Sequence, residues 1–531
     1  MKSAWPLLVL SLLAAAACSS SDSSTPPPND NDAGSDAGGR EVTKLPPLST
    51  SVKLTDTETI VPTHAVAPKI IEPSAMDPAV RDQQLASGFG AFTSGAGEQL
   101  TPDGSTPPQP GANRHRLTRF VQMTDLHVTD DESPTRLASF DSGPPFESAW
   151  RPQEGHECRI LNAAVRTVNR IHKDAPIDFV LLGGDSVDNA QQNELDWVLA
   201  LLGGADRLAC DSGDPDDPVP GPNNDGKDPF APEGLDVPWY WVTGNHDVLI
   251  QGNFAVTDQN LAQSIGSSAP QGTRDYREPG SPITQDDIVA DPNRAAMRRA
   301  TLIDRVVAHT GKAGPPSHGL GDYAKQTKKA FYTADLGTSG VRLIVVDSAA
   351  ETGYSEGVLR TSDVEAFVKP ELARAKTDGK LVIFASHHAA LSLADGNGLG
   401  GTKQADAITQ KDWEDLLTAN PHVIGHIAGH SHLHSVRSVA AGAPGVGQYW
   451  EIRTSALVDY PHQFRTIEIW DEDNGYLTFR SVAVNYATEN DPVALAGRTL
   501  GILDYTSHGV GGGQGEPKDR NIILWTKKPA P

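Results

Sequence analysis

The stretch from Trp239 to Asp247 constrains this chain most, because an apolar segment there runs straight into Gly-Asn-His-Asp. Residues 239–242 have the pattern of a short buried strand, and a tight turn would present Asn245, His246 and Asp247 at its tip. Packing gives no reason to end a buried strand in side chains that bind metals and transfer protons. The stretch therefore predicts a functional loop at the carboxyl end of a β-strand.

Four other apolar segments end in the same way, with Asp or His at or close to the end of the strand. They are Phe120–His127, Phe179–Asp185, Val382–His388 and Ile424–His432. Helical patterns at 157–173 and 193–202 follow the first two of these strands, so strand and helix alternate. This alternation predicts a parallel α/β core with ligands at the carboxyl ends of its strands. We therefore expect the five strand ends to meet at one site.

The later part of the chain adds strands and two long insertions. Strands are expected at 342–346, 381–385, 422–427, 449–454, 465–470 and 476–483, and helices near 363–375 and 410–419. Pro370 should kink or split the first of these helices. No helix separates the last strands, so antiparallel hairpins are expected, with a turn at 472–475. The insertions, 205–237 and 248–329, consist mostly of loop residues, and the second should overhang the site.

The side chains at the strand ends are types that bind transition metals. Asp185 has two carboxylate oxygens and can bridge two ions, Asn245 offers a neutral carbonyl oxygen, and the histidines offer ring nitrogens. Mixed nitrogen and oxygen ligands suit Mn, Fe or Zn better than Mg or Ca. Two such ions about 3.5–4 Å apart, bridged by hydroxide, would hold and polarise a phosphoryl group. The sequence thus predicts two divalent metal ions and a phosphate-ester substrate.

Taken in chain order, the motifs match one known family. The series Asp125-Leu-His127, Gly184-Asp185, Gly244-Asn-His-Asp247, His387-His388 and Gly429-His-Ser-His432 resembles the calcineurin-like metallophosphoesterase superfamily, between Leu117 and Ala483. The resemblance implies an α/β fold: a four-layered α/β/β/α sandwich of two mixed sheets flanked by helices, here with long loop insertions. It also implies a phosphoric ester hydrolase that uses a dinuclear metal centre and a bridging hydroxide to attack a phosphomonoester or phosphodiester.

The resemblance further implies a role for each motif residue. The first ion would be bound by Asp125, His127, Asp185 and His432, and the second by Asp185, Asn245, His387 and His430. His387 is preferred to His388 because it directly follows the strand, and His388 would then support a ligand or contact the substrate. His246 would protonate the leaving oxygen or stabilise charge on the phosphoryl group, and Asp247 would orient its imidazole.

At two points the sequence differs from known subgroups of the family, and each difference disfavours one subgroup's function. Asp188 stands where purple acid phosphatases have a tyrosine ligand, and Asp188-Asn189 offers no basic phosphate clamp of the kind found in Ser/Thr protein phosphatases. Both subgroups are therefore disfavoured. The alternatives left open are a nucleotide or lipid head-group phosphodiesterase or pyrophosphatase, and a non-catalytic surface binding lipoprotein on the same scaffold.

The amino terminus predicts export. Lys2 precedes an apolar run from Leu7 to Ala17, followed by Cys18, which resembles a bacterial signal peptide with a lipid-modified cysteine. The membrane partner would be reached through lipid on Cys18, and Ser19 favours an outer-membrane lipoprotein, in the periplasm or at the cell surface. Cys158 and Cys210 form either a disulfide or two separate thiols.

Composition and the family resemblance together divide the chain into five expected parts. They are a signal peptide (1–17), a disordered tether (18–40), an extended amino-terminal wrap (41–116), a metallophosphoesterase domain (117–485) and a carboxyl-terminal extension (486–531). The formal net charge of −24 argues against binding to a nucleic-acid backbone. Composition leaves the oligomeric state open.

Overall fold

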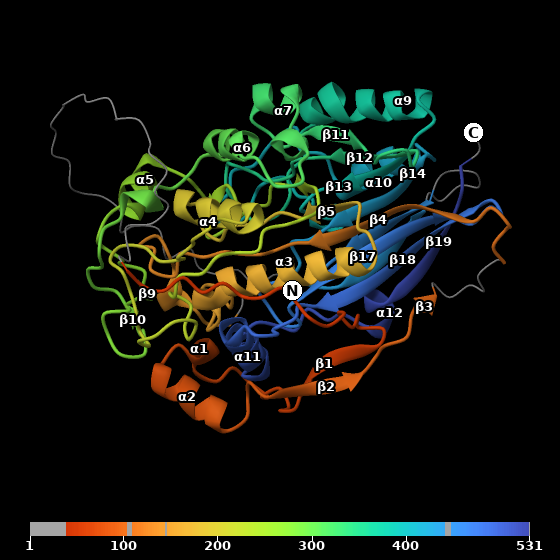
Figure 1. Ribbon diagram of the computed structural model, residues 1–531. Helices are drawn as coiled ribbons and strands as arrows, with labels where there is room; N and C mark the ends of the chain where they lie inside the picture. The colour runs from red at the N-terminus through yellow and green to blue at the C-terminus, as the bar shows by residue number, and fades with distance from the viewer. Residues whose placement is uncertain (1–38, 103–108, 144–145, 441–447, 530–531) are drawn as a thin grey trace, which may run out of the picture. The chain divides into compact units, whose positions relative to one another are not determined.

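Two mixed β-sheets carry the strands that end in the motifs (Figure 1). The computed structural model describes residues 39–529, apart from 103–108, 144–145 and 441–447. The first sheet has seven strands, in the order β3 (Thr101–Pro102), β19 (Ile522–Lys527), β18 (Tyr476–Asn485), β17 (Gln463–Asp471), β4 (His115–Met123), β5 (Phe179–Leu182) and β6 (Trp239–Trp241). Strands β4, β5 and β6 are parallel, whereas β17 is antiparallel to both β4 and β18.

The second sheet has six strands. Their order is β11 (Tyr332–Asp335), β12 (Val341–Val345), β13 (Leu381–Ala385), β14 (Val423–Ala428), β16 (Gln448–Arg453) and β15 (Ser435–Ala440). The four inner strands are parallel, and the edge strands β11 and β15 are antiparallel to their neighbours. Both sheets thus mix parallel and antiparallel strands, as the family resemblance implied.

Helices flank the two sheets and complete the four layers. Helices α3 (Glu157–Asp174) and α4 (Gln192–Gly203) connect the parallel strands of the first sheet, and α11 (Pro492–Thr506) packs against α3. Helices α9 (Lys369–Thr377) and α10 (Gln410–Thr418) lie against the second sheet (Figure 1). The predicted α/β/β/α sandwich is confirmed.

Alternating side chains on the strands of the second sheet build two apolar cores. On β13, Ile383 belongs to the large core that includes Phe120 of β4 and Ile467 of β17 in the first sheet. Phe384, the next residue, belongs to a second core with Leu372 of α9 and Trp413 of α10. Each such buried side chain contributes about 1.5–3 kcal/mol. One face of this sheet therefore packs towards the first sheet and the other holds the helices.

Several elements differ from their prediction. The turn at 472–475 joins the antiparallel pair β17 and β18 as expected, but β16 pairs in parallel with β14 instead of joining that hairpin. Pro370 does not break its helix, because α8 (Thr361–Asp363) continues through a π-helical segment, Val364–Val368, into α9. The wider π turn accommodates the missing N–H of proline.

The predicted amino-terminal wrap contains secondary structure of its own. Strand β1 (Glu58–Pro62) pairs antiparallel with β2 (Phe92–Ala96), and helices α1 (Glu72–Ala75) and α2 (Pro78–Ala86) lie between them in the sequence. Residues 69–71 form no strand. The predicted signal peptide, Cys18 and the predicted tether up to residue 38 lie outside the described residues.

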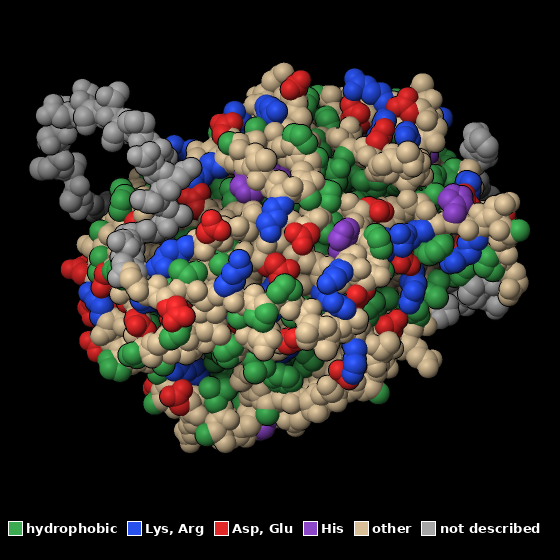
Figure 2. Space-filling model, in the orientation of Figure 1, with side chains coloured by type: hydrophobic (Ala, Val, Ile, Leu, Met, Phe, Trp, Pro, Cys, Tyr) green, Lys and Arg blue, Asp and Glu red, His purple; other side chains and the backbone are tan. Residues whose placement is uncertain are grey.

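The second insertion contains short elements. They are β7 (Leu249–Ile250), β8 (Phe254–Ala255), α5 (Asp258–Ser264), β9 (Thr273–Arg274), β10 (Ile283–Thr284), α6 (Arg299–Ala308) and α7 (Asp322–Thr327). A further short helix, α12 (Pro517–Arg520), lies outside this insertion, near the carboxyl terminus. No helix within the described ranges has the length and hydrophobicity needed to cross a bilayer. Figure 2 shows acidic and basic side chains intermixed on the face drawn, so the negative charge is not gathered in one patch there.

Candidate metal centre

The five strand-end motifs meet at the carboxyl ends of β4, β5 and β6 in one sheet and of β13 and β14 in the other. His387 Nε2 from the second sheet lies 3.0 Å from Asp185 Oδ2 of the first. His432 Nε2 lies 3.3 Å from Asp125 Oδ1, again across the two sheets. The seven side chains predicted as metal ligands are therefore brought to one place, over a sequence separation of about 300 residues.

One end of the site is formed by Asp125, His127 and His432, whose potential ligand atoms all lie within 4.8 Å of one another. The Nε2 atoms of the two histidines are 3.2 Å apart, and His127 Nε2 is 3.8 Å from Asp185 Oδ2. Nitrogen and carboxylate oxygen atoms at these separations match the first predicted ligand set.

The other end is formed by Asp185, Asn245, His387 and His430. His387 has potential ligand atoms within 4.8 Å of those of Asp125 and Asp185 on one side and of His430 on the other. The Asn245 side chain donates from Nδ2 to the carbonyl of Gly252 at 3.0 Å, while its buried Oδ1 has no hydrogen-bond partner. A buried amide oxygen without a partner is costly, and a divalent cation would satisfy it. The residues present therefore fit a second ion.

The backbone of the site is strained. Asp125, His127, Asp185, His430 and His432 have φ angles of 52°, 45°, 51°, 68° and 50°, in the left-handed region. Non-glycine residues adopt this conformation rarely, at a cost of about 1–3 kcal/mol each, and such residues cluster at functional sites. The strain turns each side chain out of its strand and into the centre.

The motifs require glycine at two positions because carboxylate oxygens of the site lie very close to the glycine backbone. A Cβ on Gly244 would lie 2.1 Å from Asp185 Oδ1, and one on Gly429 would lie 2.6 Å from Asp125 Oδ2. Any larger residue would displace a carboxylate of the site. This explains why Gly precedes Asn245 and His430 in the sequence.

Two buried chains of residues hold the histidines of the first ligand set. His127 Nδ1 donates to Asp188 Oδ1 at 3.0 Å, and Asp188 Oδ2 accepts from Arg136 at 2.9 Å. In the same way, His432 Nδ1 donates to Asp459 Oδ2 at 2.5 Å, and Asp459 Oδ1 accepts from Arg151 Nε at 2.7 Å. These contacts fix the ring orientations and leave Nε2 of each histidine to face the site.

The negative charge of the carboxylates also favours the binding of cations in the site. Burial opposes protonation of His387 and His432, but Asp185 raises the pKa of His387 to about 9, and Asp125 raises that of His432 to about 10. Burial and the neighbouring His246 lower the pKa of His127 to about 4. The carboxylates thus attract positive charge strongly, whether it is carried by protons or by metal ions.

The predicted role of Asp247 is wrong. Its carboxylate accepts hydrogen bonds from the backbone N–H groups of Ser186 at 2.8 Å and Gly244 at 2.7 Å, and it does not contact His246. His246 Nδ1 instead donates to the carbonyl oxygen of Asp188 at 2.6 Å. The reason is local: residues 246–248 form a turn, so consecutive side chains point in different directions. Asp247 holds the loop that carries Asp185, and Asp188 orients His246.

His388 lies beside the site with both ring nitrogens engaged. Nδ1 is 2.8 Å from Ser348 Oγ, and Nε2 donates to the carbonyl of Ser355 at 2.8 Å. Its ring centroid is 4.4 Å from that of His430. His388 therefore attaches the loop of residues 348–358 to the site.

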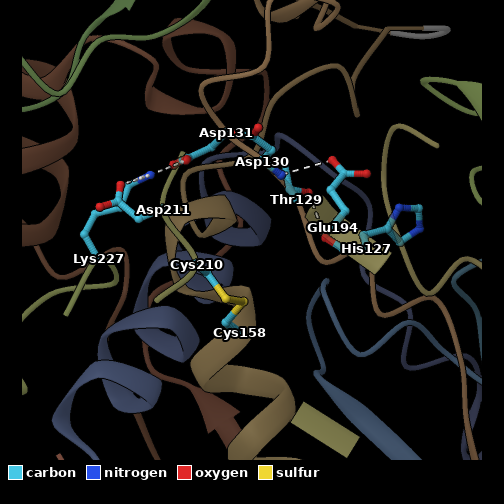
Figure 3. The surroundings of a disulfide bond; sticks show 9 residues. All are labelled: His127, Thr129, Asp130, Asp131, Cys158, Glu194, Cys210, Asp211 and Lys227. Atoms are coloured by element: carbon cyan, nitrogen blue, oxygen red, sulfur yellow. Dashed lines mark hydrogen bonds and ion pairs between the residues drawn. A yellow bond between two sulfur atoms is a disulfide. The ribbon is translucent and has the colours of Figure 1, made fainter. Parts of the chain in front are cut away.

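The insertion at 205–237 is joined to the loop after β4 by polar contacts (Figure 3). A disulfide joins Cys158 of α3 to Cys210, and Lys227 of the same insertion donates to Asp131 Oδ1 at 3.0 Å. The loop after β4 is also held where the Asp130 N–H donates to Glu194 Oε1 at 3.0 Å. The insertion at 205–237 thus supports the loop that carries His127.

Sequence reasoning missed Asp188, Asp459, Arg136 and Arg151 as supports of the site. Asp188 stands three residues after Asp185, on the same loop, and this spacing was the available signal. Asp459 follows no motif, and Arg151 is 308 residues away from it in the sequence. Only the packing of the two sheets brings that pair together.

Comparison with known proteins identifies the family. The model of the calcineurin-like phosphoesterase family matches residues 118–434, more than half of the 531 residues. No curated protein matches the chain. Among solved structures, purple acid phosphatase PPD1 from yellow lupin (Lupinus luteus) seeds is similar at 10% identity and a TM-score of 0.29. The match covers 74% of this chain and 54% of that one, and its similarity is too low to indicate a shared substrate.

The chain belongs to the calcineurin-like phosphoesterase family, and its class is that of the metallophosphoesterases, the metal-dependent hydrolases of phosphoric esters. The superfamily expected from the motifs is therefore confirmed. It also agrees with the groups of His and Asp side chains that can hold metal ions.

Proposed function

We propose that this metallophosphoesterase hydrolyses a phosphomonoester or phosphodiester at a dinuclear centre. Asp125, His127 and His432 would bind the first ion, Asn245, His387 and His430 the second, and Asp185 both. Mn, Fe or Zn suit this mixed set of ligands. The observation that carries the proposal is the convergence of these side chains from two sheets, with five of the seven held in left-handed backbone conformations.

The protein's own residues would position the reaction. When bound, two divalent ions would supply Lewis acidity towards the phosphoryl oxygens and a hydroxide nucleophile. The Asp188 carbonyl holds His246 through Nδ1, which leaves Nε2 to face the leaving oxygen of a substrate. His246 would donate a proton there or stabilise charge on the phosphoryl group.

The substrate class follows from a direct test. Purified protein, stripped with a chelator and reloaded with Mn²⁺, Fe²⁺ or Zn²⁺, is assayed on p-nitrophenyl phosphate, its bis-ester, nucleotides, pyrophosphate and phospholipids. We expect two ions per chain and hydrolysis that is lost on stripping and restored on reloading. Preference for the bis-ester or phospholipid would indicate a diesterase. A protein that binds no metal and hydrolyses none of these compounds would support the non-catalytic binding lipoprotein instead.

We also propose that Cys18 carries lipid and attaches the enzyme to the outer membrane. The support is the short apolar run after Lys2 and the polar residues that follow Cys18. Labelling of expressing cells with a radioactive fatty acid would mark the wild type and leave a Cys18→Ser variant unlabelled. Equal labelling of both would contradict the proposal.

A further inference from the structure

The four candidate histidine ligands differ in how their rings are held. His127 Nδ1 donates to Asp188 at 3.0 Å and His432 Nδ1 to Asp459 at 2.5 Å, while His387 Nδ1 donates to the Gly183 carbonyl at 2.9 Å. Each of these three rings has one nitrogen on a protein acceptor and the other towards the site. Metal-binding histidines generally need such a partner, because it fixes the tautomer and the ring orientation.

His430 is the exception among these four rings, and the carboxylate of Glu356 lies beside its Nε2. The distance from His430 Nε2 to Glu356 Oε2 is 3.7 Å, longer than a hydrogen bond. Oε2 of Glu356 is buried and has no hydrogen-bond partner, although the side chain as a whole is 34% exposed. Among the described residues, no Lys or Arg forms an ion pair with Glu356. A buried carboxylate oxygen without a partner is costly unless a donor satisfies it.

The backbone around Glu356 is fixed beside His430. The carbonyl of Ser355 accepts from His388 Nε2 at 2.8 Å, and the N–H of Gly357 donates to the Ser392 carbonyl at 2.8 Å. The N–H of Tyr354 also donates to the Asn253 carbonyl at 2.8 Å. A Cβ on Gly357 would lie 2.6 Å from His388 Cβ, so the loop packs directly on that residue. A change in the Glu356 side-chain torsions alone can therefore close the gap to His430.

We propose that Glu356 is a positioning residue for the second metal ion. Its carboxylate accepts a hydrogen bond from His430 Nε2, which leaves His430 Nδ1 to bind the ion. The inference rests on the proposed dinuclear centre and adds to it a residue outside the family motifs. Glu356 would do for His430 what Asp459 does for His432. Removal of such a partner typically lowers metal affinity about 10–100-fold.

The test measures metal binding by the full chain. Stripped wild type, Glu356→Ala and Glu356→Gln are titrated with Zn²⁺ or Mn²⁺, and bound metal is counted after equilibrium dialysis. Glu351→Ala is the matched control, because Glu351 is an exposed carboxylate on the same loop. Glu356→Ala should bind one of its two ions about 10–100-fold more weakly and the other normally. Glu356→Gln should keep most of the affinity, because its amide oxygen can still accept from His430.

Three results would overturn the proposal. The first is two ions bound by Glu356→Ala with wild-type affinity, and the second is equal weakening of both ions in a folded variant. The third is a Glu356→Gln variant as weak as Glu356→Ala. Unchanged ion affinity with a loss for particular substrates would place Glu356 at the substrate instead. A wild type that binds two ions and hydrolyses no ester would contradict the proposed function, and the affinities would still test Glu356.

Discussion

The two ends of the metal centre are built differently. At the first end, His127 and His432 are backed by the buried pairs Asp188–Arg136 and Asp459–Arg151. At the second, Asn245 and His387 are held by the backbone carbonyls of Gly252 and Gly183. There, His430 faces the partly exposed Glu356 without a hydrogen bond.

This difference indicates which of the two ions is bound more tightly by the fold. Buried Arg–carboxylate pairs give little net stability, but they fix geometry tightly. Carbonyl oxygens and a partly exposed carboxylate restrict their partners less. We therefore expect the first ion to be held tightly and the second to exchange more readily.

Asp185 is common to both ends, so its loss should have the largest effect. Asp185→Ala is expected to lose both ions and about a thousandfold or more of the phosphoesterase activity. Metal analysis and the p-nitrophenyl assays measure this. The matched control is Asp196→Ala, a partly exposed carboxylate on α4. A wild-type rate in Asp185→Ala would refute the site.

His246 belongs to neither end, so its replacement should separate chemistry from metal binding. His246→Gln is expected to retain both ions and to lower kcat about 100–1,000-fold, because a proton donor is removed. Turnover and bound metal are measured on the same preparation. Loss of an ion in this variant would show that His246 is itself a ligand.

Replacement of Asp459 tests the first end of the metal centre, where the ion is expected to be bound more tightly. Asp459→Asn cannot serve His432 and the cationic Arg151 as the carboxylate does, so affinity for the first ion should fall about 10–100-fold while the second is unchanged. For Glu356→Ala the opposite result is expected: weaker binding of the second ion and unchanged binding of the first. Equilibrium dialysis gives both affinities. If Asp459→Asn weakens the two ions equally, the division of the centre into two independent ends is wrong.

Low pH should weaken a hydrogen-bonded carboxylate, Glu451, that holds the chain beside the second end of the metal centre. Glu451 of β16 accepts a hydrogen bond at 2.8 Å from the N–H of Ala390, which stands two residues after His388. Burial opposes its ionisation, but His426 and Arg437 lower the pKa of Glu451 from 4.5 to about 2. A lowered pKa in the folded state adds stability above pH 4.5, about 3 kcal/mol here, which is lost as the pH falls towards 2.

Urea unfolding at pH 7 and pH 3 measures this contribution. Wild type should lose about 2 kcal/mol more than Glu451→Gln between the two values, because the variant has no carboxylate to protonate. Asp459 at the first end should add a loss of the same sign in both proteins, since Arg151 and His432 hold the pKa of its carboxyl far below the usual range despite its burial. Identical pH dependence in wild type and Glu451→Gln would contradict the shift.

The sequence predicted the parts of the molecule that depend on short stretches. Strands such as β5 and β13 and helices such as α3 follow from hydrophobic periodicity, and the seven candidate ligands follow from motifs of two to four residues at strand ends. Asp185 and Asn245 follow the neighbouring strands β5 and β6, so both could be named as candidates from the sequence.

Tertiary structure decided the features that depend on distant partners. The motifs could not show that Asp459 would meet Arg151, that Glu356 would face His430, or that Cys158 would bond to Cys210. They also misassigned Asp247, because the direction of a side chain in a turn depends on backbone angles rather than on spacing. Sequence encodes donor types locally, whereas the choice of partner is made by the packing of the two sheets.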